Sequence, residues 1–174
     1  EISECLVGSE MCIRDRSMKI LKRIFIDGLS GMAIGLFATL IIGTILEQAG
    51  TIIGGDIGNM IIMVASIAKV LTGAGIGIGV ASKLGESTLV CASAASAGMI
   101  GAFASGLLNG SVSSSGKILL SGPGEPLGAF VAAYIGIEIG RIFIGRTKLD
   151  IILTPLTTIV CGGCLLYTSD AADE

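Results

Sequence analysis

The stretch GLSGMAIGLFATLIIGTIL, residues 28–46, contains 19 residues and no charged side chain. A helix needs about 20 predominantly apolar residues to cross the hydrocarbon core of a bilayer. A longer uncharged stretch, of 30 residues, covers 87–116. Over all 174 residues, 52% are hydrophobic and only 14% are charged, whereas about 25% are charged in typical soluble domains. The sequence therefore predicts a protein that is embedded in a membrane.

Five apolar segments are long enough to span or half-span a bilayer. They cover residues 24–46, 57–81, 87–108, 126–144 and 150–163. Backbone N–H and C=O groups in lipid must bond to one another, so we expect these segments to be helices. The predicted fold is all-α, a polytopic transmembrane helical domain.

The two ends of the chain do not resemble this apolar middle. Reverse-translated, residues 6–16 and 164–174 fit the two matching ends of a transposase-type sequencing adapter. We therefore expect 1–16 and 164–174 to be adapter-derived and not native, with ordinary polar tails as the alternative. The native part, 17–163, carries nine basic and seven acidic residues, so the net charge of −3 for the whole chain does not indicate an acidic function.

Lysine and arginine are distributed unequally between alternate connections. The first connection, 47–56, has neither, whereas basic residues gather before the first segment and between the last two (Lys19, Lys22, Arg23, Arg146 and Lys148). Cytoplasmic loops carry the excess of these residues. We therefore expect a cytoplasmic N-terminus. If 109–125 is a re-entrant hairpin, the expected side of the membrane is reversed for every connection after it.

Small residues recur at every fourth position in three segments. The sets are Gly31 and Gly35; Ala94, Gly98, Ala102 and Gly106; and Gly136 and Gly140. This spacing lets helix backbones approach closely. The glycine-rich TGAGIGIGVASK, 72–83, does not have the spacing of either nucleotide-binding fingerprint. We expect a broken helix or a tight helix crossing there, and transporters place their substrates at such points.

The chain contains no histidine. This excludes a phosphohistidine, a Ser–His or Cys–His nucleophile pair and most zinc sites. Cys91 and Cys161 lie in apolar runs without metal-ligand spacing. We expect no catalytic residue, no metal, no cofactor and no nucleic-acid partner.

Several charged residues fall inside predicted spanning segments, and one of them, Asp27, lies near the start of the first segment, where we expect it to be interfacial. A charge at the bilayer centre costs at least about 2.5–3.5 kcal/mol, so it usually faces a partner or a cavity. Glu138 and Arg141 are three residues apart and can pair on one helix face. Lys69 has no opposite charge within one turn, so it must reach across helices or line a cavity. We therefore treat Lys69 as a candidate substrate-binding residue.

The stretch LLSGPGEPLGAF, 119–130, interrupts the apolar pattern with a carboxylate. Pro123 and Pro126 prevent a regular helix through it, and Gly122 and Gly124 permit unusual backbone angles. Pro126 suits the first turn of a helix, which puts Glu125 at its N-cap. Glu125 is then either a capping residue at the membrane surface or a carboxylate on a re-entrant hairpin that accepts hydrogen bonds from sugar hydroxyls.

Four stretches carry a resemblance to a known family. They are KRIFIDGLSGMAIGLFATLIIGTIL (22–46), LTGAGIGIGVASKLG (71–85), GPGEPLGAFVAAYIGIEIGR (122–141) and TKLDIILTPLTTIV (147–160). They resemble bacterial phosphotransferase-system IIC-type sugar permeases, some of which are described as toxin regulators. GPGEP is also similar to the G-x-x-E-P motif of the glucose-type IIC superfamily, whose glutamate contacts the sugar.

The resemblance implies a site and a function. Gly122, Glu125 and Pro126 match the motif and Gly124 lies between them, so we expect these residues to bind substrate. A IIC component is a multi-pass protein of the bacterial inner membrane and binds and translocates a sugar. Its partners IIA and IIB carry the phosphoryl group, so the chain itself is not expected to be an enzyme. A homodimer is possible. The alternative to a permease is a ligand-sensing membrane regulator that transports nothing. Family members are about twice as long, so we expect an N-terminal part.

The adapter hypothesis makes a direct prediction about the source DNA. Resequencing that DNA without adapter ligation should recover the codons for 17–163 but not those for 1–16 or 164–174, and neither end should make tertiary contacts. If either end is found in genomic DNA, the hypothesis is wrong.

Overall fold

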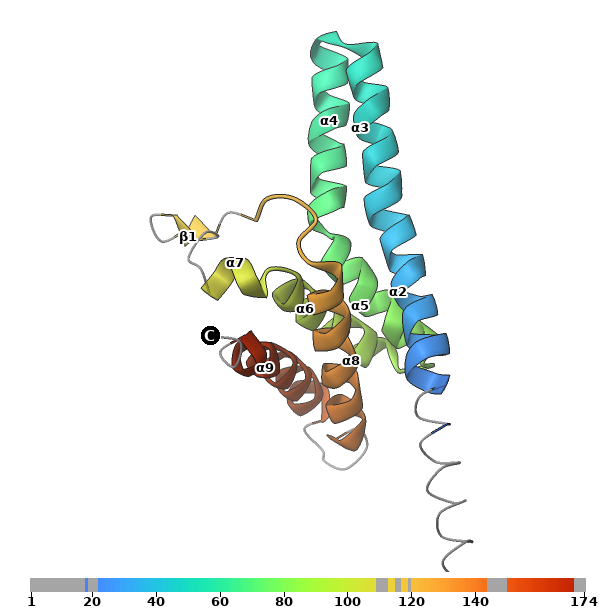
Figure 1. Ribbon diagram of the computed structural model, residues 1–174, viewed down its shortest axis with the longest axis vertical. Coiled ribbons are helices and arrows are strands. Elements are labelled where there is room, and N and C mark those ends of the chain that lie inside the picture. Colours follow the sequence, from blue (N-terminus) through green and yellow to red (C-terminus); the bar gives the residue numbers. More distant parts are fainter. Residues whose placement is uncertain are drawn as a thin grey trace, which may run out of the picture.

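The computed structural model describes residues 18, 22–108, 113–114, 117–118, 120–143 and 150–170, and nearly all of them are helical (Figure 1). The helices are η1 (Arg23–Gly28), α2 (Leu29–Leu36), η2 (Phe37–Ile41), α3 (Ile42–Ile53), α4 (Gly55–Val70), α5 (Thr72–Lys83), α6 (Thr88–Ala102), α7 (Ala104–Leu108), α8 (Pro126–Phe143) and α9 (Asp150–Asp170). Two short strands, β1 (Ser113–Ser114) and β2 (Lys117–Ile118), pair antiparallel with Ser113 opposite Ile118. The prediction of an all-α protein is confirmed.

The first four elements form one continuous helix of 31 residues, Arg23–Ile53, which is long and apolar enough to cross a membrane. It extends seven residues beyond the predicted end at residue 46, and η1 and η2 are π-helical turns within it. The helices α4 and α5 meet the same criterion as a pair, with a bend of 50° between them. The sequence predicted one segment at 57–81 and did not predict its bend.

Helices α6 and α8 run in opposite directions. Helix α6 ends beside the start of α8, where Glu125 bonds to Ala102, and its beginning lies near the end of α8, where Arg141 pairs with Glu86. The connection between α6 and α8 therefore begins and finishes at the same end of this helix pair. The hairpin of α3 and α4 projects beyond the other helices (Figure 1).

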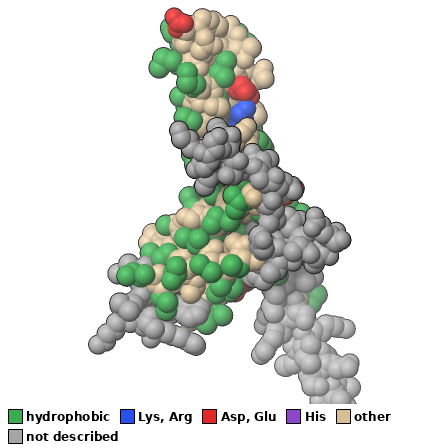
Figure 2. Space-filling view, turned by 90° about the vertical axis from the view of Figure 1, so that its left-hand side faces the viewer, with side chains coloured by type: hydrophobic (Ala, Val, Ile, Leu, Met, Phe, Trp, Pro, Cys, Tyr) green, Lys and Arg blue, Asp and Glu red, His purple; other side chains and the backbone are tan. Residues whose placement is uncertain are grey.

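The interior of the protein is rich in small residues, and many of its large apolar side chains point outward. Among the residues that the structure describes, eight of the fourteen buried hydrophobic ones are alanines. Large side chains such as Phe37 and Ile52 are 58% and 85% exposed, and hydrophobic side chains cover much of the face drawn in Figure 2. Soluble proteins rarely expose apolar patches of this extent. This surface suits a lipid environment.

Helix α5 contacts two neighbours through two sets of glycines. A methyl group on Gly31 of α2 would lie 2.5 Å from the carbonyl oxygen of Gly79, and one on Gly35 would lie 2.6 Å from the carbonyl carbon of Gly75. Such distances leave no room for any side chain. The predicted close approach at Gly31 and Gly35 is confirmed.

The other set of glycines in α5 faces α6. A methyl group on Gly73 would lie 2.8 Å from the carbonyl oxygen of Gly98, and one on Gly77 would lie 2.6 Å from the carbonyl carbon of Ala94. The stretch 72–83 is thus an unbroken helix at a double crossing. The predicted motif on α8 is also at an interface, because a methyl group on Gly136 would lie 2.8 Å from the carbonyl oxygen of Thr158 in α9.

The predicted adapter boundary falls inside a helix. Helix α9 continues through residue 163 to Asp170, and Cys164 is exposed. Residues 1–16 and 171–174 lie outside the described part of the chain. The adapter origin of both ends stays a prediction.

The double crossing at α5 makes a prediction about stability. Gly77→Ala should lower the free energy of unfolding, because the new methyl group would force α5 and α6 apart at a cost of roughly 1–3 kcal/mol. Helix propensity alone would favour alanine by about 1 kcal/mol. Thermal unfolding in detergent measures the effect, with Ile78→Ala as the control, since Ile78 is the exposed neighbour. A melting temperature raised by Gly77→Ala would contradict the packing.

Candidate functional site

Three helices are interrupted at one level of the molecule. The first interruption separates α4 from α5 at Leu71, where the Thr72 hydroxyl donates a hydrogen bond to the Lys69 carbonyl at 2.6 Å. The second separates α6 from α7 at Phe103, whose backbone angles are φ −112° and ψ 14°. The third is the loop that leads into α8 at Pro126. Interrupted helices free backbone groups that can bind a ligand.

The three interruptions meet at Ala102. The Glu125 N–H donates a hydrogen bond of 2.7 Å to the Ala102 carbonyl oxygen. A methyl group on Gly124 would lie 2.6 Å from that same oxygen, and one on Gly73 would lie 2.7 Å from the Ala102 Cβ. The GPGEP loop is therefore fixed against the end of α6, next to the start of α5.

Two glycines give the loop its shape. Gly122 and Gly124 have φ angles of 79° and 67°, in the left-handed region that other residues rarely adopt. A second reason for glycine at position 124 is its contact with Ala102, which leaves no room for a side chain. A side chain on Gly122 would meet open space. A substitution at Gly122 would therefore act through backbone strain, and one at Gly124 through strain and a clash.

Glu125 occupies the position that the sequence predicted, at the N-terminal end of α8. Its carbonyl accepts the first helical hydrogen bond, from the Ala129 N–H at 3.1 Å, and Pro126 begins the helix. Glu125 is exposed, and its carboxylate forms neither an ion pair nor a hydrogen bond with any described residue. The carboxylate is thus held on a rigid backbone and is free to accept hydrogen bonds.

Lys69 reaches across to another helix, one of the two outcomes expected from the sequence. Its Nζ lies 2.7 Å from Glu47 Oε2 of α3, and the two side chains are 19% and 33% exposed. Within the described part of the chain, Lys69 forms no ion pair with Glu125. The sequence reasoning missed Glu47, although Gly43, Glu47 and Gly50 share the helix face that packs on α4, where Gly43 meets the Lys69 side chain.

A second charged cluster lies at the far end of the helices. The side chain of Glu86 is only 9% exposed. Its Oε1 forms ion pairs with Arg141 Nε at 3.0 Å and with Arg23 Nη2 at 3.7 Å. Arg141 also pairs with Glu138 at 3.5 Å, as the sequence predicted. Glu86 was missed because it lies in the turn between α5 and α6, where a single charge gives no signal. The cluster ties the first helix to the end of α8, away from the GPGEP loop.

Chemically, the site offers a carboxylate and backbone groups but no redox or metal-binding set. The described residues contain no group of three His, Cys, Asp or Glu side chains that could hold a metal ion. A free carboxylate beside interrupted helices suits a neutral ligand rich in hydroxyl groups, because ionised acceptors form hydrogen bonds roughly twice as strong as neutral ones.

Comparison with known proteins identifies the family. No curated protein and no solved structure matches the chain. The sequence profile of the family described as "Phosphotransferase system, EIIC" matches residues 26–169, which is most of the chain and includes the GPGEP loop. The match also extends past residue 163. This chain therefore belongs to the phosphotransferase system EIIC family of membrane transporter components.

Proposed function

We propose that this chain forms part of the sugar-binding membrane component of a phosphotransferase system, and that Glu125 accepts hydrogen bonds from sugar hydroxyls. The observation that carries the proposal is the unpaired, exposed carboxylate on a loop fixed against interrupted helices. Gly122, Gly124 and Pro126 belong to the proposed site because they fix the position of that carboxylate.

The level of the loop along the first helix supports this proposal. Gly124 packs on Ala102, and Ala102 packs on Gly73. Two residues further along α5, Gly75 packs on Thr39 of the first helix. Residue 39 is near the middle of the Arg23–Ile53 helix, about 21–24 Å from either end at a rise of about 1.5 Å per residue. Transporters hold their substrates near the middle of the bilayer, where discontinuous helices meet.

Lys69 has a lesser role in the proposed site. It is tied to the α4–α5 interruption through its carbonyl, but its ammonium group is neutralised by Glu47. We expect it to border the sugar site and to contribute less to affinity than Glu125. Because removal of Lys69 would leave Glu47 unpaired, its main effect should be on stability.

The phosphoryl group would come from partner proteins in the proposed function. The chain has no histidine that could carry it. We propose that IIA and IIB components supply the phosphoryl group to the bound sugar, as the family implies. The end that carries Arg23, Lys83 and Arg141 would be cytoplasmic, since Lys and Arg accumulate on that side.

Replacement of Glu125 tests the sugar site. In the full-length protein, Glu125→Gln keeps the shape but weakens the acceptor by about 1.5–3 kcal/mol, which corresponds to a roughly 10- to 150-fold loss of affinity. Binding is measured with radiolabelled hexoses, hexosamines and disaccharides, and uptake is measured with and without IIA and IIB. Glu138→Gln, at the other end of α8, is the matched control.

Two outcomes of that experiment would contradict parts of the proposal. If Glu125 only caps α8, its replacement should cost about 0.5–2 kcal/mol of stability and leave sugar affinity unchanged. Unchanged affinity with a lowered melting temperature would therefore contradict the sugar site. Sugar binding without uptake, even with both partners present, would indicate a regulator instead of a permease.

Cysteine labelling tests the proposed orientation. A cysteine at Ile20 should react with a membrane-impermeant maleimide only in permeabilised cells, whereas one at Ile52 should react in intact cells. Ile52 is suited to the experiment because it is 85% exposed at the tip of the α3–α4 hairpin. The reverse labelling pattern would overturn the orientation.

A further inference from the structure

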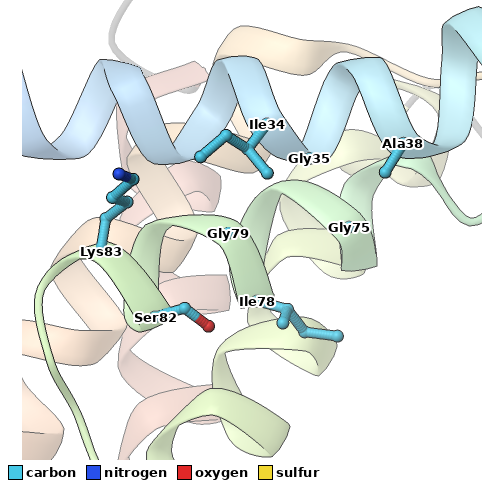
Figure 3. Close-up of a pocket in the computed structure, with 8 residues that line it drawn as sticks. All are labelled: Ile34, Gly35, Ala38, Gly75, Ile78, Gly79, Ser82 and Lys83. Atoms are coloured by element: carbon cyan, nitrogen blue, oxygen red, sulfur yellow. The ribbon is translucent and has the colours of Figure 1, made fainter.

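A groove of about 470 Å³ lies between the first helix and α5, outside the GPGEP loop (Figure 3). Gly35 from the first helix and Gly75 and Gly79 from α5 contribute backbone to it where the two helices touch. The groove exists because these positions carry no side chains while their neighbours do. It is therefore a consequence of the same close packing that builds the fold.

The walls of the groove are mostly apolar. Ile34 and Ala38 come from the first helix, and Ile78 comes from α5 (Figure 3). Ile34 and Ile78 are 51% and 46% exposed, so the groove opens onto the outer surface of the helices. Among the described residues that line the groove, Ser82 and Lys83, at one end of it, are the only ones with polar side chains, and the remaining walls suit a hydrocarbon chain.

The length of the groove also suits a hydrocarbon chain. It follows α5 from Gly75 to Lys83, which is about 12 Å at a helical rise of about 1.5 Å per residue. A groove of this length with mostly apolar walls takes one acyl chain more readily than a compact polar ligand.

One end of the groove is positively charged. Lys83 lines it there and is exposed, and Figure 3 shows its side chain extending from the end of α5 toward the first helix. Lys83 forms no ion pair with a described residue, whereas nearby Arg23 and Arg141 are both paired with Glu86. The charge of Lys83 is thus available to an anion at the mouth of the groove.

We propose that this groove binds one acyl chain of an anionic phospholipid, whose phosphate lies at Lys83. Basic pockets between membrane helices bind anionic lipid headgroups, and each lysine near the surface contributes about 1 kcal/mol. The apolar walls hold the chain, and the lysine selects the headgroup. Neutral phospholipid fills the groove less well because it offers no net charge to Lys83.

The test compares lipid retention by the purified full-length protein in detergent. Native mass spectrometry counts bound phosphatidylglycerol and bound phosphatidylcholine with the same acyl chains. The wild-type protein should retain phosphatidylglycerol about fivefold more strongly, and Lys83→Gln should lose this preference. Lys22→Gln is the matched control, because Lys22 is also exposed near that end but does not line the groove.

A second pair of variants tests the acyl-chain contact. Ala38→Phe should fill the groove and reduce retention of both lipids, whereas Ala33→Phe, on the same helix but outside the groove, should not. Lys83→Gln changes only an exposed side chain, so the proposal stays testable even if Ala38→Phe does not fold.

Several results would overturn the proposal. They are an equal preference for both lipids in the wild-type protein, the same retention by Lys83→Gln as by Lys22→Gln, or no retained lipid at all. Disulfide crosslinking between two copies through Ala38→Cys would show that a second copy covers the groove. Protection of that cysteine from a lipid-soluble maleimide in lipid-free protein would show that another part of the chain covers it.

Discussion

The contact between α5 and its neighbours is made by backbone atoms, because glycines stand where the helices cross. In a bilayer the surroundings of a helix are as apolar as its side chains, so helices associate through close packing and not through the hydrophobic effect. Gly75 and Gly79 meet the first helix, and Gly73 and Gly77 meet α6. Helix α5 therefore joins the first helix to α6 through backbone contacts on both of its sides. The Ala-rich interior and the outward-facing Ile, Leu and Phe side chains follow from this mode of packing.

The same close packing places the candidate site. Because Gly73 lets α5 approach Ala102, the end of α6 lies beside the α4–α5 bend. Because Gly124 has no side chain, the loop before α8 can then bond to the Ala102 carbonyl through the Glu125 N–H. The position of the Glu125 carboxylate thus depends on the contact of its loop with Ala102 and, one helix further on, on the contact of Ala102 with Gly73.

The sequence predicted much of this fold but not its pairings. Long uncharged stretches located the helices, and four-residue spacing located the glycines that pack, since both patterns depend only on local sequence. The sequence predicted a broken helix or a tight crossing at 72–83, and the crossing is present. Which glycine meets which depends on tertiary structure, so neither the two partners of α5 nor the bend at Leu71 could be predicted. Glu125 was placed correctly because two prolines and two glycines restrict the backbone locally. The partners Glu47 and Glu86 were missed because each contributes a single charge at a distance in sequence.

Helix α8 has one consequence for how the two ends of the protein communicate. It is a single unbroken helix of 18 residues, about 27 Å long, with Glu125 directly before its first residue and Arg141 in its last turn. Because α8 is one continuous helix, a contact that holds its last turn restricts the tilt of the whole helix. The ion pair between Glu86 and Arg141 therefore limits the tilt angles of α8. It thereby also limits the positions available to Glu125. We therefore expect a substitution at Glu86 to shift the GPGEP loop, although Glu86 lies at the opposite end of α8.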